Sequence, residues 1–131
     1  MIPKFRVYNK TTKLMYPVKF ISYPLRTVRC INKHGLRSSE ETFYLTREEI
    51  VLMQSTGLKD KNDVEIFDGD VVKLQYTITS DFELFEVRQF RGGMWRIDNR
   101  RRGSDLWLRN EDCEVIGNIY QNSDLLESVE E

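Results

Sequence analysis

Hydrophobic and polar residues alternate over short segments through much of the chain, which is the period of half-buried strands. Turn-forming residues separate these segments at short intervals, as in small all-β domains. The clearest signal is Gly92-Gly93, which lies between alternating residues at 84–90 and 94–97 and predicts a tight hairpin. The pattern predicts strands at residues 4–8, 14–21, 28–31, 71–78, 84–90, 94–97, 106–108 and 113–120. Short strands at this spacing indicate a mainly β protein with a small barrel or rolled sheet.

One segment fits two interpretations. Thr46 and Glu49 have the spacing of a helix-capping box, which would begin a short helix. The apolar, β-branched residues that follow favour a strand over 50–55 instead. Gly57 would end a helix soon after its start, so both interpretations stay open at this point.

Residues 52–72 form the centre of the chain, with two predicted turns between apolar anchors. We interpret this stretch as a structural corner that fixes how two strands meet, carried by Gly57, Asp60, Gly69 and Asp70. A cation site is the alternative, because the stretch is rich in carboxylates: Asp60, Asp63, Glu65, Asp68 and Asp70. The calcium-loop pattern is not met, since Val64 occupies the position of the third ligand. We therefore expect no metal and no cofactor here.

Four segments resemble the YopX family of phage and prophage proteins. They are KFRVYNKTTKLMYPV, LMQSTGLKDKN, IFDGDVVKL and EVIGNIYQN, and they occur in this order over most of the chain. One departure is Asp63, which stands in a turn where the family usually has glycine. The resemblance implies a β-rich fold with an SH3-like barrel. It implies no known activity and no catalytic residues.

Pattern and resemblance together predict a small SH3-like β-barrel with an N-terminal β-hairpin extension. We expect the extension to cover residues 1–48, the barrel core 49–123 and an acidic C-terminal tail 124–131. A chain of 131 residues fits one domain, or one domain with an appendage.

The cysteines and the apolar runs predict the cellular setting. Cys30 and Cys113 share no metal-binding spacing and are too few for a disulfide framework, so we expect both thiols to be reduced. No apolar run approaches the ~20 residues that cross a bilayer, and no segment has the form of a signal peptide. The expected location is the cytoplasm of a bacterial host, without membrane association.

Charge is strongly segregated although the net charge is only −1. Residues 1–40 carry nine bases and one acid, and residues 41–87 carry four bases and eleven acids. Residues 88–109 carry seven arginines and two acids, and residues 110–131 carry seven acids and no base. Such blocks pair either within one chain or between copies, and the second possibility predicts a homo-oligomer.

The sequence lacks the motifs of familiar enzymes. It has no phosphate-binding glycine loop with its lysine and no nucleophile elbow. His34 is the only histidine, and its polar neighbours predict a solvated loop residue. We therefore expect no enzymatic activity.

Arginines between 96 and 109 are the best candidate for ligand binding. Guanidinium groups bind phosphates in a forked geometry, and tryptophan can stack on bases. Trp95 and Trp107 flank these arginines, although both are in phase with apolar neighbours and are expected in the core. The candidate contact residues are Arg96, Arg100, Arg101, Arg102 and Arg109.

These observations lead to one prediction of function and one alternative. The prediction is a non-enzymatic phage or prophage accessory protein that acts through contacts with a phage or host protein, or with itself. The alternative is a nucleic-acid-binding module that uses the arginine-rich loop, although the acidic blocks oppose a polyanion.

Overall fold

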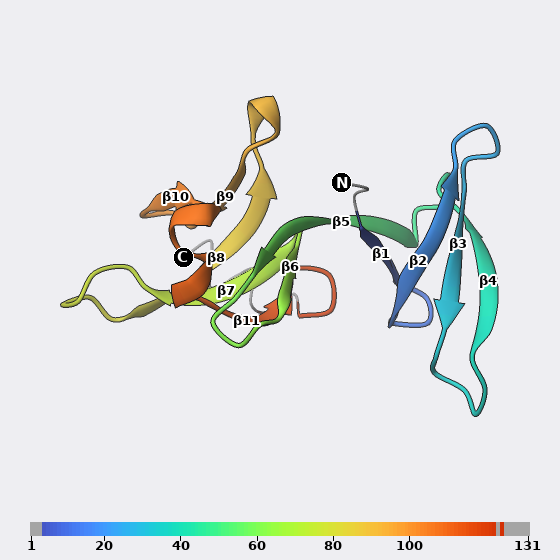
Figure 1. The fold of residues 1–131 in the computed structure, drawn as a ribbon, viewed down its shortest axis with the longest axis horizontal. Coiled ribbons are helices and arrows are strands. Elements are labelled where there is room, and N and C mark those ends of the chain that lie inside the picture. Colours follow the sequence, from blue (N-terminus) through green and yellow to red (C-terminus); the bar gives the residue numbers. More distant parts are fainter. Residues whose placement is uncertain (1–3, 123, 125–131) are drawn as a thin grey trace. The chain divides into compact units, whose positions relative to one another are not determined.

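The computed structural model describes residues 4–122 and 124, so most of the predicted acidic tail lies outside the described residues. The chain folds into antiparallel strands and short 3-10 helices (Figure 1). Its internal contacts define two compact units, residues 1–54 and 55–131, which are described separately. No helix in the described part has the length and apolar character needed to cross a bilayer.

The first unit is an antiparallel sheet with the strand order β4-β3-β2-β1-β5. Its strands are β1 (Phe5–Asn9), β2 (Leu14–Ser22), β3 (Thr27–Asn32), β4 (Ser39–Tyr44) and the N-terminal half of β5 (Ile50–Lys59). Alternation in β3 shows how the sheet acquires two faces. Val28 and Cys30 are completely buried, whereas Arg29 between them is exposed. The buried face forms a core from Val7, Tyr16, Val28, Cys30 and Ile50.

The second unit contains an antiparallel sheet with the strand order β10-β9-β8-β7-β11. These strands are β7 (Asp70–Gln75), β8 (Phe82–Gln89), β9 (Trp95–Asp98), β10 (Gly103–Asp105) and β11 (Glu114–Asn118). A short strand, β6 (Glu65–Phe67), pairs with the C-terminal half of β5. The core contains Ile66, Val72, Leu74, Phe85, Val87, Ile97, Leu106 and Cys113.

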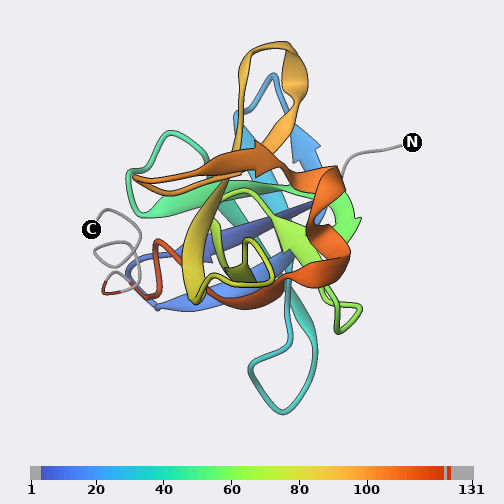
Figure 2. The ribbon, with the colours of Figure 1, turned by 90° about the vertical axis from the view of Figure 1, so that its left-hand side faces the viewer.

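The described part of the second unit also contains three 3-10 helices. They are η1 (Arg91–Gly93), η2 (Leu106–Leu108) and η3 (Asn110–Asp112). Gly92 and Gly93 have φ values of 83° and 84°, which a glycine adopts readily. They form the connection of the β8–β9 hairpin, as predicted, and this hairpin extends beyond the neighbouring strands of its sheet (Figures 1 and 2).

The prediction of a mainly β protein is confirmed, and the prediction of a closed barrel is wrong. Among the described residues the strands form antiparallel sheets rather than a closed barrel. The ends of the five-stranded sheet are β10, which is only three residues long, and β11, whose register shifts between Val115 and Gly117. Such ends offer few ladder partners for closure. An SH3-like arrangement stays a prediction.

Two local predictions are resolved by the structure. Residues 50–59 form strand β5, and residues 45–49 form turns, so the helix interpretation of the capping-box segment is wrong. The predicted strand at 106–108 is also wrong, because these residues form η2. Its turn is closed by the Arg109 N–H, which donates to the Leu106 carbonyl at 2.9 Å. Only Leu106 of this apolar triplet is buried.

Candidate functional site

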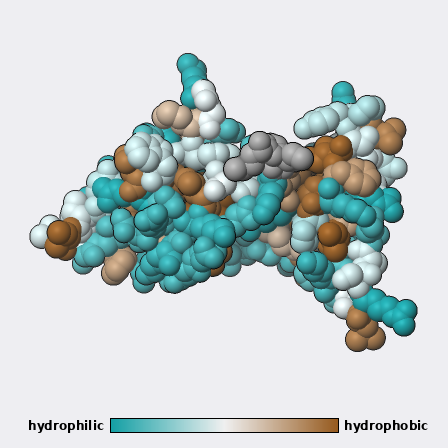
Figure 3. Space-filling view, viewed as in Figure 1, coloured by the Kyte–Doolittle hydropathy of each residue, from teal (hydrophilic) through white to brown (hydrophobic). Residues whose placement is uncertain are grey.

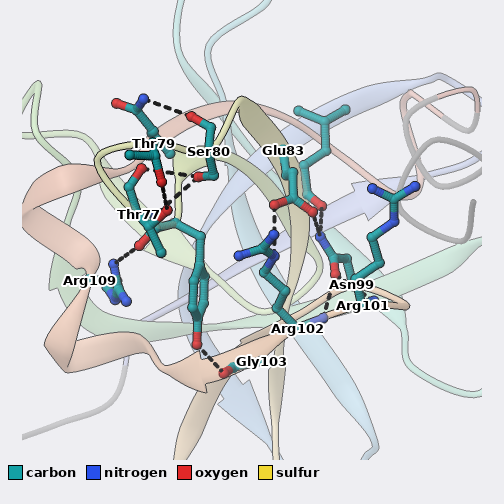
Figure 4. Close-up of polar contacts among 12 residues, drawn as sticks. Thr77, Thr79, Ser80, Glu83, Asn99, Arg101, Arg102, Gly103 and Arg109 are labelled. Atoms are coloured by element: carbon teal, nitrogen blue, oxygen red, sulfur yellow. Dashed lines mark hydrogen bonds and ion pairs between the residues drawn. The ribbon is translucent and has the colours of Figure 1, made fainter.

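Asn99 organises the arginine-rich turn between β9 and β10 (Figure 4). Its Oδ1 accepts hydrogen bonds from the backbone N–H groups of Arg101 and Arg102, at 2.8 and 2.9 Å. Its Nδ2 donates to Glu83 Oε1 and to the Leu84 carbonyl, at 3.3 and 3.2 Å. One half-buried side chain therefore shapes the turn and attaches it to β8.

Two of the candidate arginines lie on one aromatic ring. The guanidinium carbons of Arg102 and Arg109 are 5.1 and 4.4 Å from the Tyr76 ring centroid, a cation–π geometry. Arg102 Nε is 3.0 Å from Glu83 Oε2, and Arg109 Nη1 donates to the Tyr76 carbonyl at 2.8 Å. The Tyr76 hydroxyl donates to the Gly103 carbonyl at 3.1 Å (Figure 4). These two arginines therefore stabilise the end of the sheet.

Arg96 is enclosed by acidic side chains. Its Nη1 is 3.2 Å from Asp105 Oδ1, its Nη2 is 3.5 Å from Asp98 Oδ1, and its guanidinium carbon is 5.2 Å from the Phe90 centroid. Two carboxylates offset its charge, so Arg96 offers little attraction to an external phosphate.

Gly103 makes room for this cluster. A Cβ atom at Gly103 would lie 2.1 Å from Asp98 Oδ1 and 2.8 Å from Arg96 Nη2. We expect Gly103→Ala to displace both side chains and to lower the free energy of unfolding by about 1–3 kcal/mol, the usual effect of overpacking. Urea unfolding measures this loss, with Gly35→Ala as the control, because a Cβ there would meet only a backbone oxygen at 3.8 Å. Equal stability of the two variants would contradict the geometry of the cluster.

Arg100 and Arg101 differ from the other three candidates. Both side chains are exposed at the turn. Among residues 4–122 and 124, no side-chain ion pair or hydrogen bond is described for either guanidinium. Figure 4 shows Arg101 extending away from Asn99, whose Oδ1 accepts its backbone N–H. The structure thus reduces the candidate phosphate contacts to these two side chains.

The two tryptophans have different environments. Trp95 is partly buried and packs against the core of the second unit, as predicted. The prediction for Trp107 is wrong, because η2 leaves this side chain 66% exposed. The apolar neighbours of Trp107 suggested a buried strand, whereas a 3-10 turn directs successive side chains to different sides.

The predicted corner contains a buried carboxylate that binds backbone N–H groups. Asp60 is 5% exposed. Its Oδ1 accepts from the N–H groups of Asn62 and Val64, at 2.8 and 3.0 Å, and its Oδ2 accepts from Val115 N–H at 2.8 Å. Asp60 therefore closes its own turn and connects that turn to β11, more than fifty residues further along the chain.

The second turn of the corner is built in the same way. Asp70 is 1% exposed, and its Oδ2 accepts from Phe67 N–H at 2.8 Å. Gly69 has a φ of 86°, donates to the Val87 carbonyl and accepts from Ile119 N–H. These are the contacts that a structural corner requires.

Gly57 and Asp63 both adopt left-handed backbone conformations, with φ values of 79° and 65°. Gly57 lies where the register of β5 against β6 shifts, and its N–H donates to Ser55 Oγ at 3.0 Å. Asp63 stands where the resemblance expects glycine, and aspartate tolerates this region better than most residues.

The metal-site alternative requires several ligand side chains close together. In the described part of the chain, no three His, Cys, Asp or Glu side chains are grouped so that they could hold a metal ion. The Asp60 carboxylate already accepts three backbone N–H groups. Burial raises the pKa of Asp68, and the Gly69 backbone opposes that effect.

His34 is exposed, as predicted, yet its ring contacts the first sheet. Its Nε2 is 2.8 Å from the Met15 carbonyl oxygen, and its ring meets Tyr16 edge-on with centroids 5.4 Å apart. No local sequence signal predicts this, because Met15 and Tyr16 lie on β2, far from His34 in the sequence.

Both cysteines are free, and each lies in the core of a different unit. Burial, as the main cause, raises the pKa of the Cys30 thiol and of the Cys113 thiol to about 12. Both thiols are therefore protonated and poorly reactive at neutral pH.

Comparison with known proteins identifies the family. The chain matches the YopX protein family over residues 4–127. It is 31% identical over 70 residues to the SPbeta prophage-derived uncharacterized protein YopX of Bacillus subtilis (strain 168), covering 49% of this chain and 52% of that protein. The aligned segment thus spans about half the length of this curated relative.

Two crystal structures share the fold. Protein EF1440 from Enterococcus faecalis has a TM-score of 0.65 and 27% identity, covering 96% of this chain and 99% of that one. Protein yopX from Bacillus subtilis has a TM-score of 0.64 and 19% identity, covering 93% and 96%, so this likeness concerns the fold alone. The family match over nearly the whole chain confirms the resemblance seen in the sequence, and this chain belongs to the YopX protein family.

Proposed function

We propose that this chain is a non-enzymatic accessory protein of prophage type that acts through protein–protein contacts in the host cytoplasm. The family supports this proposal only in outline, since the curated relative is prophage-derived and uncharacterized. The observation that carries the proposal is the edge strand β4. An edge strand presents backbone N–H and C=O groups that can pair with another chain.

Natural sheets protect their edges, and three edge strands of the described chain are protected. The strand order places β4, β6, β10 and β11 at sheet edges. Strands β6 and β10 have only three residues each, and the register of β11 is interrupted. Shortness and irregularity are two common ways to prevent edge pairing.

Strand β4 carries two charged residues, Glu40 and Glu41, but it is neither short nor irregular. It has six residues, contains neither proline nor glycine, and pairs with β3 in one uninterrupted register from Ser39 to Tyr44. Its residues Ser39 to Thr42 are exposed, and the Tyr44 side chain is 54% exposed. This edge supports a role in binding a protein strand.

Apolar side chains at loop ends add smaller contact points. Leu36, in the β3–β4 connection, and Ile78, in the β7–β8 connection, are almost fully exposed. In Figure 3, apolar atoms appear at the ends of these two connections, and further apolar patches lie among the hydrophilic residues elsewhere on the visible surface. Scattered apolar residues of this kind are common, so the edge strand carries more weight.

Light scattering at tens of micromolar protein tests the proposal, together with a screen for turnover of phosphoesters and nucleic acids. We expect an assembly larger than one chain, or retention of a defined partner, and no turnover. A strictly monomeric chain that retains no partner would contradict the proposal. Turnover that purifies with the chain would contradict its non-enzymatic part.

One observation favours a second function. Arg100 and Arg101 are exposed at a turn whose backbone is held by Asn99, which is a fixed geometry for phosphate contact. The double variant Arg100→Ala/Arg101→Ala should therefore abolish any DNA binding, or lower its salt slope by about 2. The measurement is a titration of labelled single- and double-stranded DNA at about 50 and 200 mM salt.

The matched control for this titration is Arg37→Ala/Arg47→Ala, which removes two exposed arginines from the first unit. It changes the net charge by the same amount. Loss of DNA binding in Arg100→Ala/Arg101→Ala alone would therefore assign the DNA contact to the turn. Equal binding by both double variants would eliminate the turn as a nucleic-acid site.

A further inference from the structure

The hydrogen-bond alternation of the β3–β4 ladder determines which backbone groups face outward. Leu45 N–H donates to the Arg26 carbonyl at 2.9 Å, just beyond the last paired residues Thr27 and Tyr44. Hydrogen-bonded and non-hydrogen-bonded pairs alternate in an antiparallel ladder. By this alternation, the backbone N–H and C=O groups of Phe43 and Glu41 bond to β3. The residues whose N–H groups point away from the sheet are therefore Glu40, Thr42 and Tyr44.

We propose that two copies of this chain pair through antiparallel β4 strands, with Thr42 opposite Thr42 of the second copy on a two-fold axis. This inference rests on the proposed role of β4 in protein contacts and names its partner. In this register the outward N–H of Thr42 donates to the Thr42 carbonyl of the second copy. The Thr42 N–H of the second copy donates in turn to the Thr42 carbonyl of the first. Each Tyr44 N–H meets the Glu40 carbonyl of the second copy.

The side chains of β4 select this register. Shifting the two-fold axis by one residue toward the N-terminus of β4 places Glu41 opposite Glu41 of the second copy. Like charges directly opposite each other are destabilising. Shifting the axis by one residue toward the C-terminus places Phe43 opposite Phe43 of the second copy. The two strands then overlap over fewer residues, because β4 ends at Tyr44. Only the Thr42-centred register joins the strand over residues 40–44 without opposing like charges.

The backbone of Glu40 faces the second copy in this register, and its carboxylate is already paired within its own sheet. Its carboxylate lies 2.8 Å from Lys19 Nζ and 2.7 Å from Arg29 Nε, on the same face of the sheet. Hydrogen bonds from Lys19 and Arg29 lower the pKa of Glu40. A charge that is offset in this way repels an approaching acidic strand less than a free carboxylate does.

A second copy fits this edge, because the Thr42-centred register places Glu40 and Glu41 opposite Tyr44 and Phe43 of the second copy rather than opposite another acid. Closed two-fold dimers are the commonest symmetric assemblies, and their interfaces use the same surface on both copies. Pairing also continues the row formed by Phe20, Arg29 and Thr42, which are register partners across β2, β3 and β4. Phe20, which is 54% exposed, then lies on a continuous sheet built from the strands of both copies.

Thr42→Cys tests the register through disulfide formation in the full chain. Residues in a hydrogen-bonded antiparallel pair have Cα atoms about 5.5 Å apart, which is within the range of a disulfide. Cys30 and Cys113 are buried, so they do not compete for a mild oxidant. We expect Thr42→Cys to form a covalent dimer. Ser39→Cys, on the same exposed strand, should not, because its symmetry mate lies several residues away.

A second pair of variants separates pairing from folding. Thr42→Pro removes the outward N–H but no donor to β3, whereas Thr42→Val keeps that N–H. We expect Thr42→Pro to weaken association by at least about a hundredfold, since two symmetric hydrogen bonds are lost. Its circular dichroism should match that of Thr42→Val, which should still associate.

The outcomes distinguish this inference from the proposed function. If the unmodified chain self-associates but Thr42→Cys forms no covalent dimer, or if Thr42→Pro associates normally, the β4 pairing is overturned and the role in protein contacts stands. If the chain stays monomeric but retains a different protein, the second copy is overturned as the partner of β4. If it is monomeric and retains none, both proposals fail.

Discussion

Replacing Asp60 by alanine is expected to lower the free energy of unfolding by about 3 kcal/mol, because buried or half-buried N–H groups lose their acceptor. Asp60 is 5% exposed, and its carboxylate accepts from the backbone of Asn62, Val64 and Val115. The turn after β5 and strand β11 both depend on this one side chain. Chemical unfolding, followed by circular dichroism and by tryptophan fluorescence, measures the loss.

Two further variants isolate the role of the carboxylate. Asp60→Asn keeps an oxygen for the turn but places an amide N–H₂ against Val115 N–H, so its effect should be about half as large. Asp112→Ala removes an exposed acid close in sequence to β11 and should change stability by less than about 0.5 kcal/mol. If Asp60→Ala were no worse than Asp112→Ala, the corner would not be held as described.

Replacing Phe85 by alanine is expected to have the largest effect in the second unit, about 3–5 kcal/mol. Phe85 is completely buried on β8, and its ring stacks against Tyr76 with centroids 6.1 Å apart. Truncation leaves a cavity and removes the support of the ring that carries Arg102 and Arg109. Thermal unfolding should report the loss, and tryptophan fluorescence should report the change in packing, because Trp95 packs against the same core.

Phe85→Leu is the matched variant, because it keeps an apolar side chain and should cost only about 1.5 kcal/mol. Near-equal losses for the two variants would mean that Phe85 is not tightly packed. A Phe85→Ala protein with native stability would contradict the core assigned to the second unit.

The sequence allowed prediction of the features that depend on neighbouring residues. The alternation at 84–90 and 94–97 corresponds to β8 and β9, and the glycine pair between them forms the hairpin connection. The turn formers around Asp60 and Gly69 also indicated where the chain bends. These signals are local, so no knowledge of distant contacts was needed.

Features that depend on distant pairing were not predictable in this way. Closure of a barrel depends on whether edge strands find partners, and no local pattern determines that. The pairing of Arg102 with Glu83 and of Arg96 with Asp105 depends on the register of β8, β9 and β10. The sequence therefore suggested five available arginines, and the fold leaves Arg100 and Arg101.

The edge strand β4 shows the same limit. Its exposed residues Ser39, Glu40, Glu41 and Thr42 lack an apolar alternation, so periodicity gives little indication of a strand. Only the strand order shows that β4 ends a sheet, and only the register shows which N–H groups face outward. The surface on which the proposed function depends is thus visible in the fold and not in the sequence.

The most direct test of the proposed function is light scattering of the unmodified chain at tens of micromolar, alongside Thr42→Pro and Thr42→Val. We predict the mass of two chains for the unmodified protein and for Thr42→Val, and the mass of one chain for a folded Thr42→Pro. A dimer that persists in Thr42→Pro would contradict pairing through β4. A single-chain mass for all three, with no protein partner retained by the unmodified chain, would contradict the proposed role in protein contacts.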